Sequence, residues 1–82
     1  MSDRKIDTRG SGKFAQALLD GANRFCNAHP NEVWEISGVT VQDGLSLNAT
    51  DGKRHLTAKI LLPVIDMADS IFLELEKFRN AN

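Results

Sequence analysis

Residues 32–62, EVWEISGVTVQDGLSLNATDGKRHLTAKILL, decide the fold, because they contain three strand-like segments separated by two Asp-Gly turns. Apolar and polar residues alternate over 33–36 and again over 56–60, the pattern of a sheet that is wet on one face. Asp43-Gly44 and Asp51-Gly52 are strong hairpin signals, since Gly takes positive φ freely and Asp tolerates it. The stretch therefore predicts a three-stranded antiparallel meander.

The first of these strands, residues 32–41, contains a change of phase. Trp34 and Ile36 share one face, whereas Val39 and Val41 have the opposite parity. A bulge at Ser37-Gly38 would bring all four apolar side chains to one face, so we predict a bulge there. The remaining residues expected on the dry face are Leu45 and Leu47 in the second strand and Leu56, Ala58, Ile60 and Leu62 in the third.

Both flanks of the meander have helical patterns. Residues 13–28 carry one apolar stripe at three- and four-residue steps, and Gly21 on that stripe favours close approach of another element. Pro63 is expected to begin a second helix that runs to about Arg79. Asp66 and Asp69 would lie in its early turns, and Lys77 and Arg79 in its last, which suits the helix dipole.

The 82 residues are too few for more than one domain. We predict an α+β fold of order α-β-β-β-α over residues 13–82, with both helices on one face of the sheet. Residues 1–12 are expected to be a flexible polar arm, because Ile6 is its only apolar residue after the initiator. Ser11 is expected to cap the first helix; the alternative is that the helix start at Gly12 holds a phosphate.

Composition limits the classes of function. The net charge of −1 gives no overall attraction to nucleic acid, and no apolar run is long enough to span a bilayer. Cys26 is the single cysteine, and with His29 and His55 it lacks the spacing of a zinc site. The sequence thus predicts a cytoplasmic protein with no metal and no cofactor.

Catalytic residues are not evident. Cys26 and His29 are the nearest approach to a nucleophile and base, but Cys26 lies on the apolar stripe, where cysteine usually behaves as a small hydrophobe. No Gly-rich loop follows a strand to hold a nucleotide. We therefore predict that the chain is not an enzyme.

The predicted element order over residues 13–79 resembles that of double-stranded RNA-binding domains. That family reads RNA partly through lysines at the start of its second helix. The matching positions here are Pro63, Val64, Ile65 and Asp66. The resemblance therefore implies the fold without this RNA-binding surface, and favours a protein-binding descendant.

The second predicted helix is apolar over more of its girth than one sheet contact needs, since Met67 and Leu73 do not fit its main stripe. We predict that Met67, Ile71, Leu73 and Glu74 form a homodimer or partner interface. The expected function is a small interaction module, an adaptor or an inhibitor of the type carried by phages, bacteria and mobile elements. The alternative is weak nucleic-acid binding through the basic residues of the arm and of the second turn, which are Arg4, Lys5, Arg9, Lys13, Lys53 and Arg54.

Overall fold

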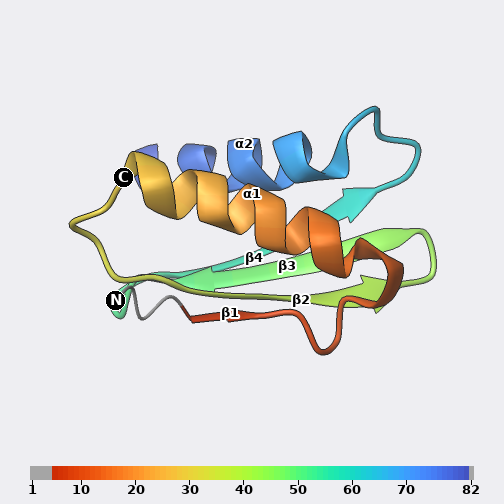
Figure 1. Cartoon of the computed structure of the whole chain (residues 1–82), viewed down its shortest axis with the longest axis horizontal. Helices are drawn as coiled ribbons and strands as arrows, with labels where there is room; N and C mark the ends of the chain where they lie inside the picture. The colour runs from red at the N-terminus through yellow and green to blue at the C-terminus, as the bar shows by residue number, and fades with distance from the viewer. Residues whose placement is uncertain (1–4, 82) are drawn as a thin grey trace.

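The computed structural model describes residues 5–81, which form a four-stranded sheet with two helices on one of its faces (Figure 1). The strand order is β1-β2-β3-β4; β1 is parallel to β2, and the other neighbours are antiparallel. The predicted α+β class, the meander and the two helices on one face are confirmed, but the sheet has one strand more than the sequence predicted. In chain order, the elements are β1 Lys5–Asp7, the short 3-10 helix η1 Gly12–Phe14, α1 Ala15–Ala28, β2 Glu35–Val41, β3 Gly44–Thr50, β4 His55–Leu61 and α2 Met67–Asn80.

The additional strand, β1, lies in the segment predicted to be a flexible arm, so that prediction is wrong for residues 5–12. Ile6 pairs with Ile36 and packs, half-buried, against the core. Ser11 is fully buried, and both its N–H and its hydroxyl donate to the carbonyl of Thr8, so its side chain does not cap the helix as predicted. This segment is ordered by β2, a strand thirty residues further along the chain, and its own polar sequence does not reveal that pairing.

No bulge interrupts β2, contrary to the prediction. Its register with β3 is continuous from Glu35 to Val41, so Val39 and Val41 point away from the helices, and Val39 is half exposed. Gly38 holds the inner position instead. A Cβ there would lie 3.1 Å from Leu18 Cδ2, so the missing side chain lets α1 pack directly on the sheet.

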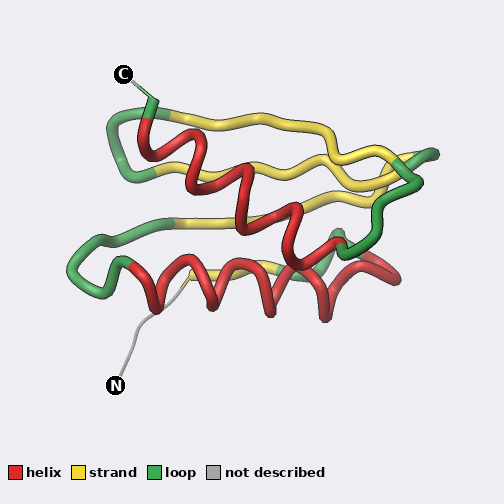
Figure 2. The backbone as a smooth tube through the Cα atoms, turned by 90° about the horizontal axis from the view of Figure 1, so that it is seen from above, coloured by secondary structure: helices red, strands yellow, loops and turns green. Residues whose placement is uncertain are grey.

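The core lies between the helices and the inner face of the sheet. Leu45, Leu47 and Ala49 of β3 are fully buried there. The two helices approach closely at Gly21, as predicted, because a Cβ on this residue would lie 2.6 Å from the carbonyl oxygen of Ala68. Figure 2 shows that α1 runs roughly along the strands, whereas α2 crosses them obliquely. The oblique helix leaves Leu56 and Ala58, on the inner face of β4, only half-buried.

The second helix begins at Met67 and not at Pro63. Asp66 is its N-cap and accepts a hydrogen bond from the N–H of Asp69 at 3.2 Å. A cap of this kind fixes the first turn better than an N-terminal proline does, because it satisfies an otherwise unpaired N–H. Leu62, which was expected on the dry face of the sheet, lies beyond the end of β4 and is 41% exposed.

Candidate interaction surface

The interface predicted on α2 is divided between the core and solvent. Met67 and Ile71 are 8% and 0% exposed and pack inside the chain, so they offer no free surface. The prediction that Met67 lies off the sheet-facing stripe is wrong, because Met67, Ile71 and Leu75 follow one another at four-residue steps. Leu73 is 55% exposed on the opposite side of the helix, with Glu74 half-buried beside it. A single exposed leucine is ordinary for a soluble surface.

The basic residues of the N-terminal segment are dispersed. Arg4 lies outside the described residues. Lys5 projects from the open face of the sheet, and Arg9 pairs with Asp7 through two hydrogen bonds of 3.0 and 2.9 Å. The Arg9 guanidinium lowers the pKa of Asp7 to about 2. Lys13, in η1, places its ammonium 5.3 Å from the centroid of the Phe14 ring.

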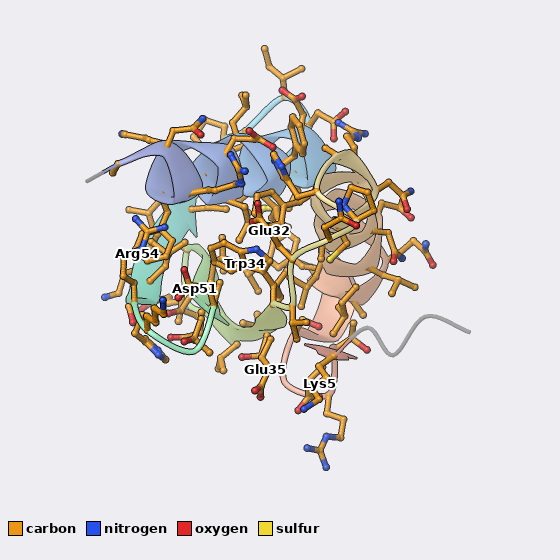
Figure 3. All side chains as sticks on the ribbon, turned by 90° about the vertical axis from the view of Figure 1, so that its left-hand side faces the viewer. Lys5, Glu32, Trp34, Glu35, Asp51 and Arg54 are labelled. Atoms are coloured by element: carbon orange, nitrogen blue, oxygen red, sulfur yellow. The ribbon has the colours of Figure 1, made fainter. Side chains whose placement is uncertain are left out.

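Arg54, at the opposite edge of the sheet, is occupied by its own chain. Its guanidinium donates to three carbonyl oxygens at the end of α2, those of Phe78, Arg79 and Ala81, at 3.2, 3.2 and 2.6 Å. It also lies 4.8 Å from the centroid of the Phe78 ring. Arg54 therefore caps the C-terminus of α2, where a cation and hydrogen-bond donors are stabilising. Figure 3 shows Arg54 and Lys5 at opposite sides of the molecule, so the two predicted basic clusters do not merge.

The open face of the sheet has a polar half and a mixed half, in which Val39, Val41 and Leu61 lie beside Ser46 and Lys59. Cross-strand register sets Lys5, Glu35, Thr50 and His55 in one row, and the ends of this row are about 14 Å apart at the usual strand spacing. A shallow depression of 640 Å³ lies over this polar half. Lys5 stands opposite Glu35, and Arg9 is paired with Asp7, so the fixed charges that line the depression balance. The depression therefore favours neither an anionic nor a cationic ligand.

Of the seven large apolar residues exposed within residues 5–81, four lie toward the other end of the sheet, while Leu19, Val33 and Leu73 lie elsewhere. Val39 and Leu61 project from the open face and are 50% and 54% exposed, and Leu62 and Ile65 follow in the loop before α2, with Ile65 fully exposed. β4 ends at Leu61, and Leu62 and Ile65 follow within the next four residues. Three exposed apolar side chains therefore lie close together in the sequence, at the end of β4 and in the loop that follows it.

The backbone of β4 has an unoccupied side. The N–H of Leu62 donates to the carbonyl of Asp43, one step beyond the Gly44–Leu61 pair. Along an antiparallel pair, residues that exchange backbone hydrogen bonds alternate with residues that do not. The backbone groups directed toward β3 are therefore those of Leu56, Ala58 and Ile60, and those directed outward are those of His55, Thr57, Lys59 and Leu61.

Within residues 5–81, no backbone hydrogen bond satisfies the outward N–H and C=O groups of these four residues. The strand runs for seven residues in unbroken register with β3, without proline or bulge. Such an edge is a template for a further strand. Sequence reasoning missed it because an edge is defined by the order of strands; the only local signal was the regular alternation of residues 55–61.

Polar groups near the C-terminal end of α2 and in the segment before β2 form a cluster that holds the chain together. Arg79 Nε and Nη2 donate to the Glu32 carboxylate at 3.0 and 2.6 Å, and Trp34 Nε1 donates to the same carboxylate at 3.0 Å. The Arg79 guanidinium, followed by the Trp34 N–H, lowers the pKa of Glu32 from 4.5 to about 2. His29 contacts the Glu76 carboxylate, and its ring lies tilted by 59° against the ring of Phe25, with the centroids 5.0 Å apart. Figure 3 shows Glu32 and Trp34 on the side of the sheet that carries the helices.

This chain matches no family model, no curated protein and no solved structure. Within residues 5–81, no three His, Cys, Asp or Glu side chains gather closely enough to hold a metal ion. No helix in this part of the chain has the length and apolar character needed to cross a membrane.

Proposed function

We propose that this chain is a small protein–protein interaction module that binds a partner by accepting a strand at the β4 edge. The observation that carries the proposal is the regular outward-facing backbone of His55, Thr57, Lys59 and Leu61. Strand addition draws its affinity from main-chain hydrogen bonds and its specificity from alternate side chains. An adaptor and an inhibitor that occupies a partner surface would both use such an edge.

The surroundings of β4 support this proposal. Leu56 and Ala58 are half-buried on the helix side, next to the fully buried Leu47 and Ala49 of β3. An added strand would extend this apolar layer, and its outward side chains would meet the exposed Leu61. Both faces of the new pair would thus gain contacts that the single chain lacks.

The experiment is a selection of displayed seven-residue peptides against the immobilised chain, at a density low enough that copies do not meet. Enriched peptides are expected to alternate apolar and polar residues. They are also expected to lose binding to a Thr57→Pro variant, which lacks the outward N–H, but not to Thr57→Val, which retains it. Failure to enrich any peptide, or equal binding to both variants, would refute edge binding.

The alternative proposal, weak nucleic-acid binding, has less support. Arg9 and Arg54 are already paired with acceptors of the chain itself, which leaves Lys5, Lys13 and Lys53 of the predicted basic residues that the structure describes, with Lys5 and Lys53 near opposite edges of the sheet. Three phosphate contacts would give a slope of about −3 in log affinity against log salt. We expect no measurable shift with duplex or single strands at low salt. A slope steeper than about −4 would favour nucleic acid over protein as the partner.

A further inference from the structure

We infer that the strand that fills the β4 edge is β4 of a second copy, so that two sheets join into one across a two-fold axis at Ala58. This inference rests on the proposed function, since both use the same edge. It goes further in naming the partner and the register. The argument comes from the side chains that such pairing sets against one another.

Pairing about Ala58 uses the whole edge. It sets Thr57 opposite Lys59 of the second copy and His55 opposite its Leu61, so all four outward-facing residues of each strand form backbone hydrogen bonds. Displacing the axis by one residue to Thr57 or to Lys59 leaves one of these residues on each copy unpaired. A strand with the sequence HLTAKIL can thus pair over its full length with a second copy of itself.

Side-chain complementarity selects the same axis. On the helix side, Leu56 of each copy faces Ile60 of the other, and the two Ala58 residues meet at the centre. In the single chain, the apolar layer formed by Leu47 and Ala49 of β3 ends at the half-buried Leu56 and Ala58 of β4. The side chains of the second copy would continue this layer. On the open face, each Lys59 faces a threonine. An axis at Lys59 would set the two ammonium groups directly opposite each other, which is destabilising.

The same symmetry gives the exposed loop after β4 a neighbour. Because Leu61 lies opposite His55 of the second copy, the loop that carries Leu62 and Ile65 starts beside the second molecule. Because the same edge is used by both copies, the two-fold pairing closes as a dimer, and within residues 5–81 the other edge strand, β1, has only three residues. Lys59 is the kind of residue that discourages edge pairing, and in this register it lies on the solvent face, away from the other lysine.

Sedimentation of the full chain from micromolar to millimolar concentration tests the inference. The expected particle has twice the chain mass of 9.0 kDa. Thr57→Pro is expected to raise the dimer dissociation constant by at least about tenfold, because it removes a donor from each of two symmetric pairs. Thr57→Val is the matched control. Both variants lose the hydrogen bond from Thr57 Oγ1 to Asn48 Oδ1, but only Val keeps the N–H.

Two charged variants test the register and do not depend on whether the proline variant folds. Thr57→Lys sets lysine opposite Lys59 twice in the dimer, and Thr57→Glu sets glutamate there. The dissociation constant is expected to rise about two- to tenfold with Lys and to fall by a similar factor with Glu. A shift of both variants in the same direction, or no shift in either, would overturn pairing about Ala58.

Amide hydrogen exchange supplies a residue-level readout. In dilute chain, the N–H groups of Leu56, Ala58 and Ile60 should exchange slowly, while those of Thr57 and Lys59 exchange fast. At dimer concentrations, Thr57 and Lys59 should become protected as well. A dimer that leaves these two unprotected refutes the inference, and so does a chain that is monomeric at millimolar concentration. Either result leaves the peptide selection, and with it the proposed function, to be judged separately.

Discussion

β1 and β4 form the two edges of one sheet, yet β1 contributes three residues and β4 contributes seven. β1 runs parallel to β2, and the loop that follows it continues the cover of that strand, because the N–H of Thr40 donates to the carbonyl of Gly10 at 2.8 Å. β4 has a regular backbone and nothing among residues 5–81 that covers its outer side.

The difference shows two ways of ending a sheet. Natural edges are blunted by shortness, charge, proline or bulges, and β1 combines a very short strand with charged residues on both sides of Ile6. β4 has only Lys59 in this role. An edge left regular and adjoined by Leu61 and Leu62 has the properties of a binding surface.

The largest expected effect is that of proline at Ala58. The N–H of Ala58 is directed toward β3, so Ala58→Pro should cost about 3 kcal/mol or more and unfold much of the protein. Thr57→Pro removes an outward N–H and should cost clearly less. Urea denaturation of the two variants measures the difference. Equal losses would mean that the inward and outward positions of β4 are assigned wrongly.

Removing the side chain that docks β1 should have the next effect. Ile6→Ala should cost about 1–2 kcal/mol, because Ile6 is only half-buried against the core. Lys5→Ala is the control on the same strand and should change the free energy of unfolding by less than about 0.5 kcal/mol. Exchange of the β2 amides should accelerate in Ile6→Ala, while that of Ala58 and Ile60 stays slow. A loss as small as that of the control would show that β1 is docked without stabilising the sheet.

Arg54 joins the turn before β4 to the end of α2, and its removal tests how firmly that edge is held. Arg54→Ala should cost about 1 kcal/mol and speed amide exchange in the last turn of α2, since three carbonyls lose their donor. Arg54→Lys should recover only part of this loss, because an ammonium cannot reach three acceptors with the planar guanidinium geometry. Lys53→Ala is the neighbouring control. An equal effect at both positions would contradict the capping role.

The smallest effect is expected on the β2 side, where Glu32 ties the segment before β2 to Arg79 of α2. Its folded pKa of about 2 lies below the ordinary 4.5, so the stabilisation is present above pH 4.5 and is lost as the pH falls toward 2. Glu32→Gln should therefore lower Tm at neutral pH and match the wild-type chain near pH 2. Melting curves between these pH values test this. A Tm difference that persists unchanged to pH 2 would exclude the ion pair as its cause.

Much of the fold was predictable because it follows from local patterns. The alternation in residues 55–61 predicted β4, and the two Asp-Gly pairs predicted both hairpins. Of the two glycines in these pairs, only Gly52 has the expected positive φ; Gly44 is the first residue of β3, and the first turn lies at Gln42 and Asp43. The three- and four-residue steps predicted α1, and Gly21 predicted the close approach of another element. The start of α2 was misplaced because Asp66, a better cap than Pro63, was assigned to a turn inside the helix.

The candidate site was not predictable to the same degree. The apolar surplus of α2 predicts an interface that includes Met67 and Ile71, but both of these residues pack in the core of the chain itself. No particular residue type in the sequence marks β4 as an edge strand. The edge consists of backbone groups, and every strand has such groups whether or not a neighbour covers them.

By itself, the sequence determined the three strands of the meander, the two hairpins that join them and the two helices, because side-chain periodicity and turn chemistry act over a few residues. Only the tertiary structure decided that residues 5–7 join the sheet, that Gly38 keeps β2 in phase beneath Leu18, and that β4 is the uncovered edge. These outcomes depend on which distant segment lies alongside, and that is settled when the core packs.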